Sequence, residues 1–280
     1  MSTHYEVRYA TNPTDFKHYD TARIRQDFLI KGLFQPGQVR MVYTHYDRYL
    51  AGGACPSDQA LRLETIDPLK ADYFLERREI GIVNVGAPGT VKVDGKAYSI
   101  GFKEALYVGK GNQEVIFEPG ENGAQPLYYF NSAPAHRVCA TKLISQADAE
   151  IVELGSLEQS NARTIRKLIV NSIVETCQLQ MGMTELKTGS VWNTMPAHIH
   201  DRRMEVYFYF ELPEDQAVCH FMGQAQESRV VWMNNQDAVI SPPWSMHTGA
   251  GTSSYTFIWG MAGENLDYGD MDGFNPVDMQ

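Results

Sequence analysis

The chain has 280 residues, of which 43% are apolar, 11% aromatic and 21% charged, the composition of an ordinary folded globular protein. This length allows one large or two modest domains, and no apolar run approaches the ~20 residues that a membrane span requires. The formal net charge of −10 disfavours nucleic acid or a membrane as partner, because such surfaces need concentrated lysine and arginine.

The cysteines and the first residues of the chain bear on its cellular compartment. The chain begins without the basic start and the apolar run of a secretory signal. Its four cysteines are widely scattered with no Cys-x-x-Cys pair, so we expect reduced and mostly buried thiols. Both features favour a cytoplasmic protein.

A helical pattern lies near the beginning of the chain. In residues 14–30, apolar side chains recur at helical spacing, with Ile24, Phe28 and Leu29 on one stripe. We therefore predict an early helix that lies against a sheet. Other helices are expected to be few and short, because strand patterns dominate the rest of the sequence.

Strand patterns fill the remainder of the first half. Runs rich in β-branched and aromatic residues predict strands at 39–44, 81–86 and 90–100. The Asp94-Gly95 pair divides the third run, and such a pair between alternating residues is typical of a two-residue hairpin turn. Residues 145–167 are polar and charged, and we interpret them as a crossover to the second half.

The second half contains another set of short strands. We place them at 206–210, 217–222, 228–233, 238–240 and 255–260. Short, evenly spaced strands separated by glycine, proline, asparagine and aspartate predict a sandwich or jelly roll. The predicted fold class is therefore mainly all-β.

The two strand sets resemble each other. Residues 75–85, which open the first set, are similar to residues 201–210, which open the second. Residues 128–136 are likewise similar to residues 255–260. We infer a duplicated β-barrel from these two correspondences.

The duplication predicts two jelly-roll barrels, one over residues 1–150 and the other over residues 151–280. The first copy has no His-x-His motif, and Tyr73 and Leu75 stand near the positions where ligands would be expected. We therefore predict an N-terminal barrel without metal ligands and a C-terminal barrel with a single metal site.

Four residues of the second half form a metal-ligand pattern. His198 and His200 alternate on one predicted strand, so their side chains point to the same face, and a tight turn can return Glu205 toward them. His247 lies on a later strand. These donors suit Zn²⁺, Mn²⁺, Fe²⁺ or Ni²⁺, and the absence of cysteine argues against a purely structural zinc.

The competing interpretation is that these histidines are ordinary surface or core residues. The chain has only 8 histidines, however, and three of them fall in one stretch of strands with a glutamate at the matching spacing. We therefore predict one divalent metal ion per chain, bound by His198, His200, Glu205 and His247.

The order His-x-His, Glu and a final His in a duplicated barrel resembles the cupin superfamily, specifically a bicupin with one working metal site. Cupins commonly carry Pro-x-Gly shortly before the final histidine, and this chain instead has Pro243-Trp-Ser-Met-His247. Longer strings narrow the resemblance to the 5-keto-4-deoxyuronate isomerase family of pectin breakdown. They are residues 73–79, 105–111, 175–186, 192–200, 202–210 and 255–261.

This resemblance covers nearly the whole chain and implies both architecture and activity. It implies a bicupin fold, a homohexamer, and one zinc ion whose ligands match His198, His200, Glu205 and His247 one for one. The implied reaction interconverts 5-dehydro-4-deoxy-D-glucuronate and 3-deoxy-D-glycero-2,5-hexodiulosonate through a metal-stabilised enediolate. The expected enzyme is thus a zinc-dependent ketol-isomerase acting on a small keto-deoxyuronate.

An aldose–ketose shift needs a base that moves a proton between adjacent carbons. Glu205 is one candidate if it can leave the metal, and Glu185 is another. The sequence does not separate them, and either residue can equally be an ordinary ligand or a surface residue. Sequence likewise leaves open whether pectin products or other hexuronates are the physiological substrate.

The uronate carboxylate needs a cation, for which a guanidinium offers a planar two-point contact. Arg163 and Arg203 are the candidates, and solvated surface arginine is the competing interpretation for both. Tyr207 and Tyr209 share the strand face of Glu205, where they either line the pocket or fill the barrel.

Three other functions fit the ligand pattern alone. A metal-dependent dioxygenase would use the same donors with iron. A non-catalytic sugar-acid-binding cupin would bind the uronate without turnover, and a storage or scaffold cupin would need neither metal nor ligand. The long matching strings favour the isomerase, because the fold by itself decides no function.

Overall fold

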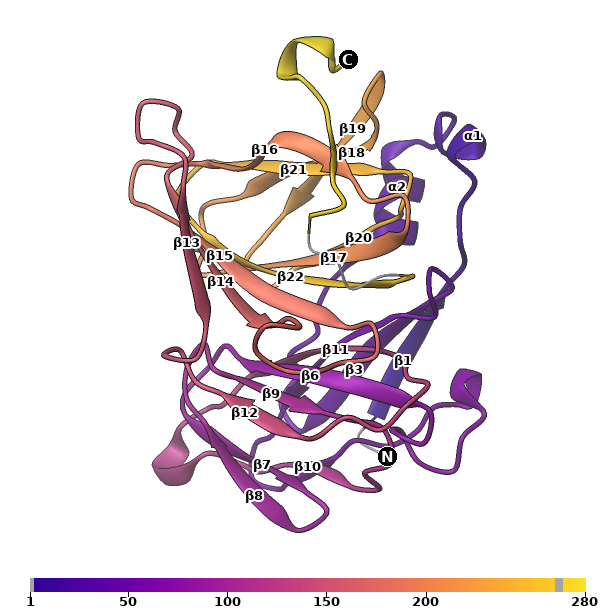
Figure 1. Cartoon of the computed structure of the whole chain (residues 1–280), viewed down its shortest axis with the longest axis vertical. Helices are drawn as coiled ribbons and strands as arrows, with labels where there is room; N and C mark the ends of the chain where they lie inside the picture. Colours follow the sequence, from indigo (N-terminus) through magenta and orange to yellow (C-terminus); the bar gives the residue numbers. More distant parts are fainter. Residues whose placement is uncertain (1–2, 265–268) are drawn as a thin grey trace. The chain divides into compact units, whose positions relative to one another are not determined.

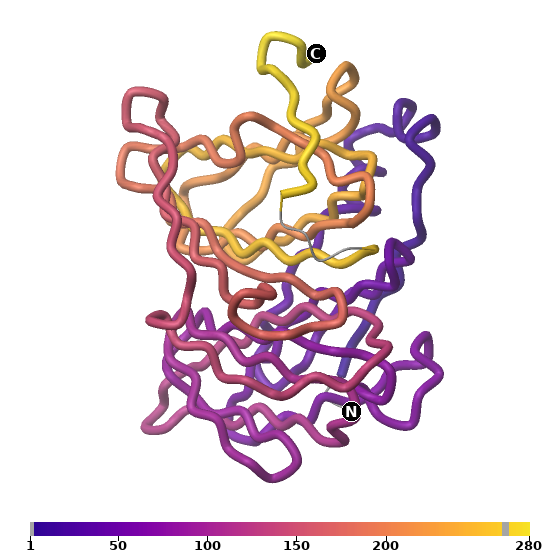
Figure 2. Tube along the Cα trace, viewed as in Figure 1, coloured from indigo at the N-terminus to yellow at the C-terminus, as the bar shows by residue number. Residues whose placement is uncertain are grey.

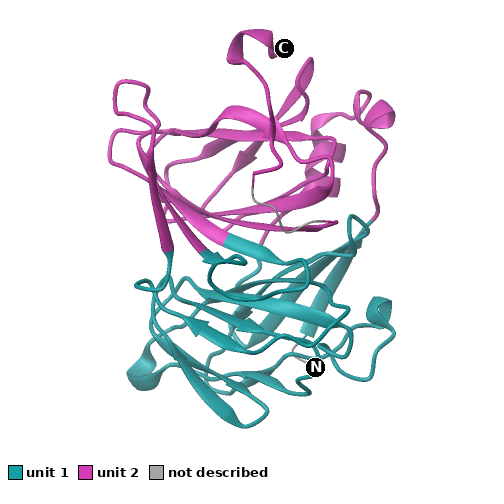
Figure 3. Ribbon diagram, in the orientation of Figure 1, with its two compact units in different colours: residues 1–8, 32–149, 168–181 teal, residues 9–31, 150–167, 182–280 magenta. Residues whose placement is uncertain are grey.

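A computed structural model describes residues 3–264 and 269–280, and the chain divides into two compact units (Figure 3). Unit 1 comprises residues 1–8, 32–149 and 168–181, and unit 2 comprises residues 9–31, 150–167 and 182–280. The predicted boundary near residue 150 coincides with one of these divisions. Residues 9–31 and 168–181, in contrast, lie in the opposite unit from the one that their sequence position suggested.

Unit 1 contains two sheets with an apolar core between them (Figure 1). The seven-stranded sheet runs in the order β1 (Thr3–Arg8), β3 (Gln38–Thr44), β4 (Leu50–Cys55), β11 (Tyr128–Pro134), β6 (Arg78–Asn84), β9 (Ala105–Val108) and β12 (Lys142–Ile144). The four-stranded sheet runs in the order β5 (Leu61–Arg62), β10 (Val115–Phe117), β7 (Gly89–Val93) and β8 (Lys96–Ile100). Ile80, Ile82 and Phe130 of the larger sheet share one buried cluster with Val91 and Phe117 of the smaller.

The predicted hairpin at residues 94 and 95 is confirmed. β7 and β8 pair antiparallel from Gly89 opposite Ile100 to Val93 opposite Lys96. Asp94 and Gly95 between them have φ angles of 46° and 81°, the left-handed values that a tight hairpin turn requires.

Unit 2 holds most of two further sheets and the two α-helices, α1 (Pro13–Phe16) and α2 (Thr21–Phe28). The seven-stranded sheet runs in the order β13 (Glu150–Leu154), β14 (Arg163–Ile169), β15 (Gln180–Leu186), β22 (Thr256–Gly263), β17 (Arg203–Phe210), β20 (Ala238–Ser241) and β2 (Leu29–Ile30). The five-stranded sheet runs in the order β19 (Glu227–Met233), β18 (Val218–Gln224), β21 (Met246–Gly251), β16 (Trp192–Ile199) and β23 (Asp272–Gly273).

The segment predicted as one helix over residues 14–30 forms two helices, α1 and α2 (Figure 1, indigo), followed by the strand β2. The Asp20 carboxylate accepts from the Arg23 N–H at 2.8 Å and caps a new helix, α2, after α1 has ended. Leu29 then pairs with Val239 of β20 as the first residue of β2, which ends the helical stripe. Among the described residues, no helix is long and apolar enough to cross a membrane.

The crossover predicted at residues 145–167 is instead largely strand. β13 pairs antiparallel with β14, with Glu150 opposite Lys167 and Leu154 opposite Arg163. β13 is the outer strand of its sheet, and charged side chains are typical of such edges, which explains why the segment reads as polar.

The duplication inferred from the sequence matches the strand order. The central run β4, β11, β6 and β9 of unit 1 corresponds to β15, β22, β17 and β20 in the other seven-stranded sheet. The similar strings at 75–85 and 201–210 enter β6 and β17, and those at 128–136 and 255–260 enter β11 and β22. Each pair of strings therefore occupies equivalent positions in the two sheets.

A buried carboxylate explains why residues 168–181 belong to unit 1. Glu79 is fully buried, and its Oε1 accepts from the N–H groups of Gln178 and Leu179 at 2.8 Å each. Its Oε2 accepts from the Cys177 N–H at 2.8 Å and from the Tyr107 hydroxyl at 2.6 Å. A single side chain thus satisfies three consecutive backbone donors, which would otherwise be buried without partners.

We predict that Glu79→Ala lowers the free energy of unfolding by at least ~3 kcal/mol, because several buried donors lose their acceptor at once. Urea unfolding followed by fluorescence measures this loss. The exposed Glu64 provides the control, since Glu64→Ala should leave the midpoint nearly unchanged. Equal midpoints for the two variants would contradict the structural role of Glu79.

Candidate metal centre

The predicted ligands lie on and beside three strands of unit 2. β16 and β21 are antiparallel neighbours, and His198 pairs directly with His247 across them. His200 follows the end of β16, where the Arg203 N–H donates to the His200 carbonyl at 3.2 Å and closes a tight turn. β17 begins at Arg203 and carries Glu205. Because β17 belongs to the other sheet, the four residues span both sheets of the unit.

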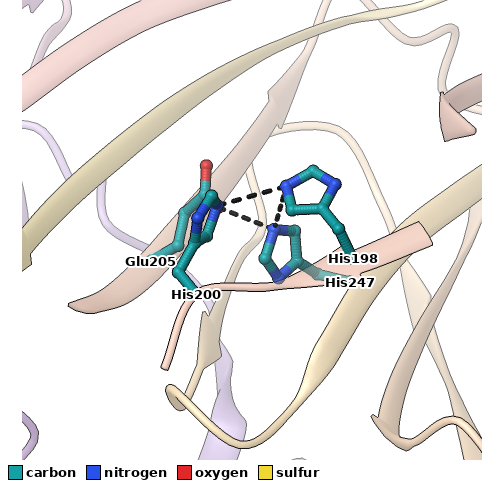
Figure 4. A group of neighbouring side chains, drawn as sticks. All are labelled: His198, His200, Glu205 and His247. Carbon is teal, nitrogen blue, oxygen red and sulfur yellow. Dashed lines mark hydrogen bonds and ion pairs between the residues drawn. The ribbon is translucent and has the colours of Figure 1, made fainter. Parts of the chain in front are cut away.

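The four side chains converge on one point (Figure 4). The Nε2 atom of His198 lies 3.1 Å from that of His200 and 3.2 Å from that of His247. Glu205 Oε2 lies 2.8 Å from His247 Nε2 and 3.4 Å from His200 Nε2. His200, Glu205 and His247 are each buried, with 4% exposure or less.

The outer nitrogens of two of these imidazoles face hydrogen-bond acceptors. His200 Nδ1 lies 3.2 Å from Asp270 Oδ1 and 3.3 Å from Arg203 Nη2, and His247 Nδ1 lies 3.4 Å from the Ser245 carbonyl oxygen. A neutral imidazole has a single N–H, and these acceptors favour its position on Nδ1. The Nε2 lone pairs then face one another at the centre, an arrangement that a bound cation would satisfy.

Electrostatics favour a neutral His198 and an ionised Glu205. Burial, together with the neighbouring His247 and His200, lowers the pKa of His198 to about 2. Burial alone would raise the pKa of Glu205, but interactions with His247 and His200 outweigh it and hold the pKa below its ordinary value. Neutral imidazoles and a carboxylate are the forms that bind metal ions.

The spacing also fits a metal ion. Two donors bonded to one ion at about 2.0–2.2 Å stand roughly 2.8–3.6 Å apart at octahedral or tetrahedral angles. The nitrogen–nitrogen separations of 3.1 and 3.2 Å fall in this range. Within residues 3–264 and 269–280, this is the one group of three or more His, Cys, Asp or Glu side chains arranged to hold a metal.

A cavity of about 350 Å³ opens onto the cluster, a size that suits a small-molecule ligand. Its polar lining consists of Arg163, Thr184, Thr194, His198, His200, Glu205 and Tyr207. The remaining lining is mostly apolar and consists of Leu154, Ile165, Met195, Pro196, Phe257, Trp259, Met261, Met271 and Gly273.

The two predicted carboxylate-binding arginines have different surroundings. Arg163 on β14 lines the cavity, is largely buried, and donates from Nη1 to the Asn161 carbonyl at 2.9 Å. The Arg203 side chain is 1% exposed, and its guanidinium forms an ion pair with Asp270. It is absent from the described lining of the cavity.

The two predicted bases also have different surroundings. Glu205 lies in the cluster and lines the cavity. Glu185 follows Thr184 on β15, and because Thr184 lines the cavity, strand alternation directs Glu185 to the other face. Its carboxylate there accepts from Arg166 Nε at 2.5 Å.

The two tyrosines of β17 lie at different depths. Tyr207 lines the cavity, and its hydroxyl lies 3.0 Å from Thr194 Oγ1. Tyr209 is fully buried, and its hydroxyl lies 2.8 Å from His220 Nδ1. Tyr207 is therefore a pocket residue, whereas Tyr209 fills the barrel interior.

Several site residues carry no recognisable sequence signal. Thr184, Thr194 and Trp259 reach the cavity only through strand alternation. Met271 lines the cavity and Asp270 contacts His200 because the chain returns to the site near its C-terminus. A strand-face assignment could have found the first group, but no local pattern marks the second.

Two jelly-roll barrels, the second with three histidines and one glutamate converging beside a cavity, define a bicupin. The profile of the KduI/IolB family matches residues 28–272. A protein of Formosa agariphila, named 4-deoxy-L-threo-5-hexosulose-uronate ketol-isomerase, is 61% identical over 272 residues, which are 97% of each chain. The chain belongs to the KduI/IolB family.

Solved structures resemble the fold at low sequence identity. An IolB-like protein from Salmonella typhimurium LT2 matches with a TM-score of 0.64 and 16% identity, over 81% of this chain and 86% of that one. An oxalate decarboxylase from Lactobacillus farciminis, in complex with formate, matches with a TM-score of 0.58 and 11% identity, over 85% and 84%. At these identities the likeness concerns the fold alone.

We predict that His220 makes unfolding pH-dependent. Burial lowers its pKa from 6.5 to about 3, so between these values the unfolded imidazole is protonated and the folded one is not. Its contribution to stability is thus fully present above pH 6.5 and is lost as the pH falls toward 3. In His220→Gln, the slope of unfolding free energy against pH should decrease by up to ~1.4 kcal/mol per pH unit.

Urea unfolding of both proteins at pH 4, 5 and 6 measures the two slopes. A control with His136→Gln, an exposed histidine, should follow the wild type. Identical slopes for His220→Gln and wild type would mean that His220 titrates normally in the folded protein.

Proposed function

We propose that this protein is a ketol-isomerase that interconverts 5-dehydro-4-deoxy-D-glucuronate and 3-deoxy-D-glycero-2,5-hexodiulosonate. The observation that carries the proposal is one cavity lined both by Arg163 and by three of the four metal-ligand residues, His198, His200 and Glu205. The name of the Formosa agariphila relative supports the same reaction, because 61% identity extends over 97% of both chains. A dioxygenase or a non-catalytic binding protein has no comparable support.

The lining of the cavity matches the parts of this substrate. The substrate has an aldehyde and a hydroxyl at one end, a carboxylate at the other and a methylene at C4 between them. The reacting end would lie at His198, His200 and Glu205, and the carboxylate would accept from Arg163. The apolar walls, which include Phe257, would contact the methylene, where a hydroxyl would remain without a partner.

The cluster would hold one zinc ion per chain through His198, His200, Glu205 and His247, and manganese, iron or nickel would suit the same donors. When bound, the metal would supply Lewis-acid stabilisation of the negative charge that develops on the substrate oxygen. The protein positions the reacting carbons beside the cluster, and the apolar walls exclude water from them.

Glu205 is the proposed base that moves the proton from C2 to C1. It lines the cavity, and its carboxylate would have to leave the metal to accept the proton. The Tyr207 hydroxyl, close to Thr194 Oγ1 at 3.0 Å, lies in the same cavity and would orient a substrate hydroxyl. Glu185 does not enter the proposal, because it pairs with Arg166 on the other face of the sheet.

The proposal extends to assembly and compartment. We propose a homohexamer located in the cytoplasm, as the family resemblance and the four free cysteines suggest. The molecular mass in solution tests the assembly, for which one chain contributes 31.6 kDa.

We predict that removal of the metal abolishes turnover and leaves the fold intact. His247→Ala or treatment with EDTA should reduce isomerase activity to background, while the apolar packing of the strands keeps the circular dichroism spectrum unchanged. Elemental analysis should find about one divalent ion per wild-type chain. His136→Ala is the control and should retain normal metal and activity.

Two results would contradict this prediction. Full activity of metal-free protein would remove the metal from the reaction, and wholesale unfolding would make it structural. Oxygen uptake by an iron-loaded sample without isomerase activity would select the dioxygenase instead.

We predict that Arg163→Ala raises KM for the uronate at least ~10-fold, because a charge-assisted hydrogen bond of about 1.5–3 kcal/mol is lost. Arg163→Lys should restore only part of this loss, since an ammonium lacks the planar two-point contact. Arg166→Ala is the matched control from the same strand, because Arg166 pairs with Glu185 away from the cavity. If Arg163→Ala keeps the wild-type KM, the carboxylate is bound elsewhere.

A further inference from the structure

The C-terminal segment after residue 268 runs along β16, the strand that carries His198 of the metal cluster (Figures 1 and 2, yellow). β23 pairs antiparallel with β16, so that Gly273 stands opposite His198. The Phe274 N–H donates to the Ala197 carbonyl at 2.8 Å. These contacts fix the segment directly beside the first histidine of the cluster.

The same segment is also held at its end. The Gln280 N–H donates to the Ala225 carbonyl, and the Gln280 carbonyl accepts from the Ser228 N–H, both at 2.8 Å. Phe274 and Met279 pack against a small apolar cluster that includes Ala225. With pairing at residues 272–274 and at 280, the segment has a defined course across unit 2.

Asp270, at the start of this segment, contacts two residues beside the metal cluster. Its Oδ1 lies 3.2 Å from His200 Nδ1, and it also forms an ion pair with Arg203. Arg203 Nη2 lies 3.3 Å from the same nitrogen of His200, but its nearer acceptor is Asp270 Oδ1. All three side chains are largely buried, with exposures of 16% for Asp270, 3% for His200 and 1% for Arg203. A buried carboxylate between two donors is held in one orientation.

We propose that Asp270 is a positioning residue for the metal centre: it accepts the Nδ1 proton of His200, and Arg203 fixes Asp270 in place. The two nitrogens of an imidazole lie on opposite sides of the ring, so Asp270 stands away from the Nε2 atom that faces His198. Asp270 therefore acts through His200 and is not itself a ligand. The inference rests on the proposed metal site.

The carboxylate has two physical effects on His200. It fixes the tautomer that leaves the Nε2 lone pair free for a metal, and its negative charge makes that nitrogen a stronger donor. The ion pair with Arg203 limits the rotation of Asp270, since a guanidinium forms directional hydrogen bonds. Removal of the charge should therefore weaken metal binding without removing a ligand.

The test compares the Zn²⁺ affinity of wild type, Asp270→Asn and Asp272→Asn by competition with a chromophoric chelator. Asp270→Asn keeps the shape of the side chain, and we expect its Kd for Zn²⁺ to rise roughly 10–100-fold. Asp272 lies in the same segment and is exposed, so Asp272→Asn should bind like wild type. Thermal unfolding of the metal-free proteins establishes that the three are equally folded.

A second variant and a spectroscopic measurement keep the test independent of folding. Arg203→Lys retains the positive charge but loses the planar contact, and its affinity should lie between those of wild type and Asp270→Asn. In Co²⁺-loaded protein, the visible absorption bands should shift in Asp270→Asn and remain unchanged in Asp272→Asn. A contribution to folding alone would not move these bands.

The possible failures are distinguishable. If Asp270→Asn binds Zn²⁺ as tightly as wild type with the same Co²⁺ spectrum, the positioning role is wrong and the metal site stands. If wild type itself binds no divalent ion, the proposed metal site and this inference both fail.

Discussion

The pairing of β16 with β21 is the constraint on which the site depends. It places His198 opposite His247, and a shift of the register by one residue would turn one of these side chains to the other face of the sheet. The short turn from β16 into β17 of the second sheet then brings His200 and Glu205 to the same point. The cluster therefore joins the two sheets of unit 2, and its geometry depends on how these two sheets pack against each other.

The two barrels use the same strand order for different purposes. In unit 1, Ile80 and Ile82 of β6 point into a continuous apolar core. In unit 2, Glu205 and Tyr207 of the equivalent β17 point into a cavity. Buried polar groups destabilise a protein unless they are paired. The interior of unit 2 therefore has polar ligands in place of apolar packing, and a bound cation would neutralise them. The one carboxylate on β6, Glu79, serves backbone donors instead of a ligand site.

The ligands and most strands could be predicted from the sequence because they depend on local spacing. His198 and His200 are two residues apart, and the hairpin turn at Asp94-Gly95 can be predicted from these two residues alone. The break in the early helix depends on the Asp20 cap and on pairing of Leu29 with a distant strand. The contact between Asp270 and His200 joins residues 70 positions apart, so no periodic pattern contains it.

Three arginines that look alike in the sequence have different surroundings, and strand geometry decides between them. Arg163 and Arg166 are three residues apart on β14, so alternation places them on opposite faces, one at the cavity and the other beside Glu185. The charge of Arg203 is offset by Asp270. For a chain with a net charge of −10, attraction of an acidic substrate therefore depends on where one cation is placed and not on the overall field. Within the described lining, Arg163 is the arginine that meets this requirement.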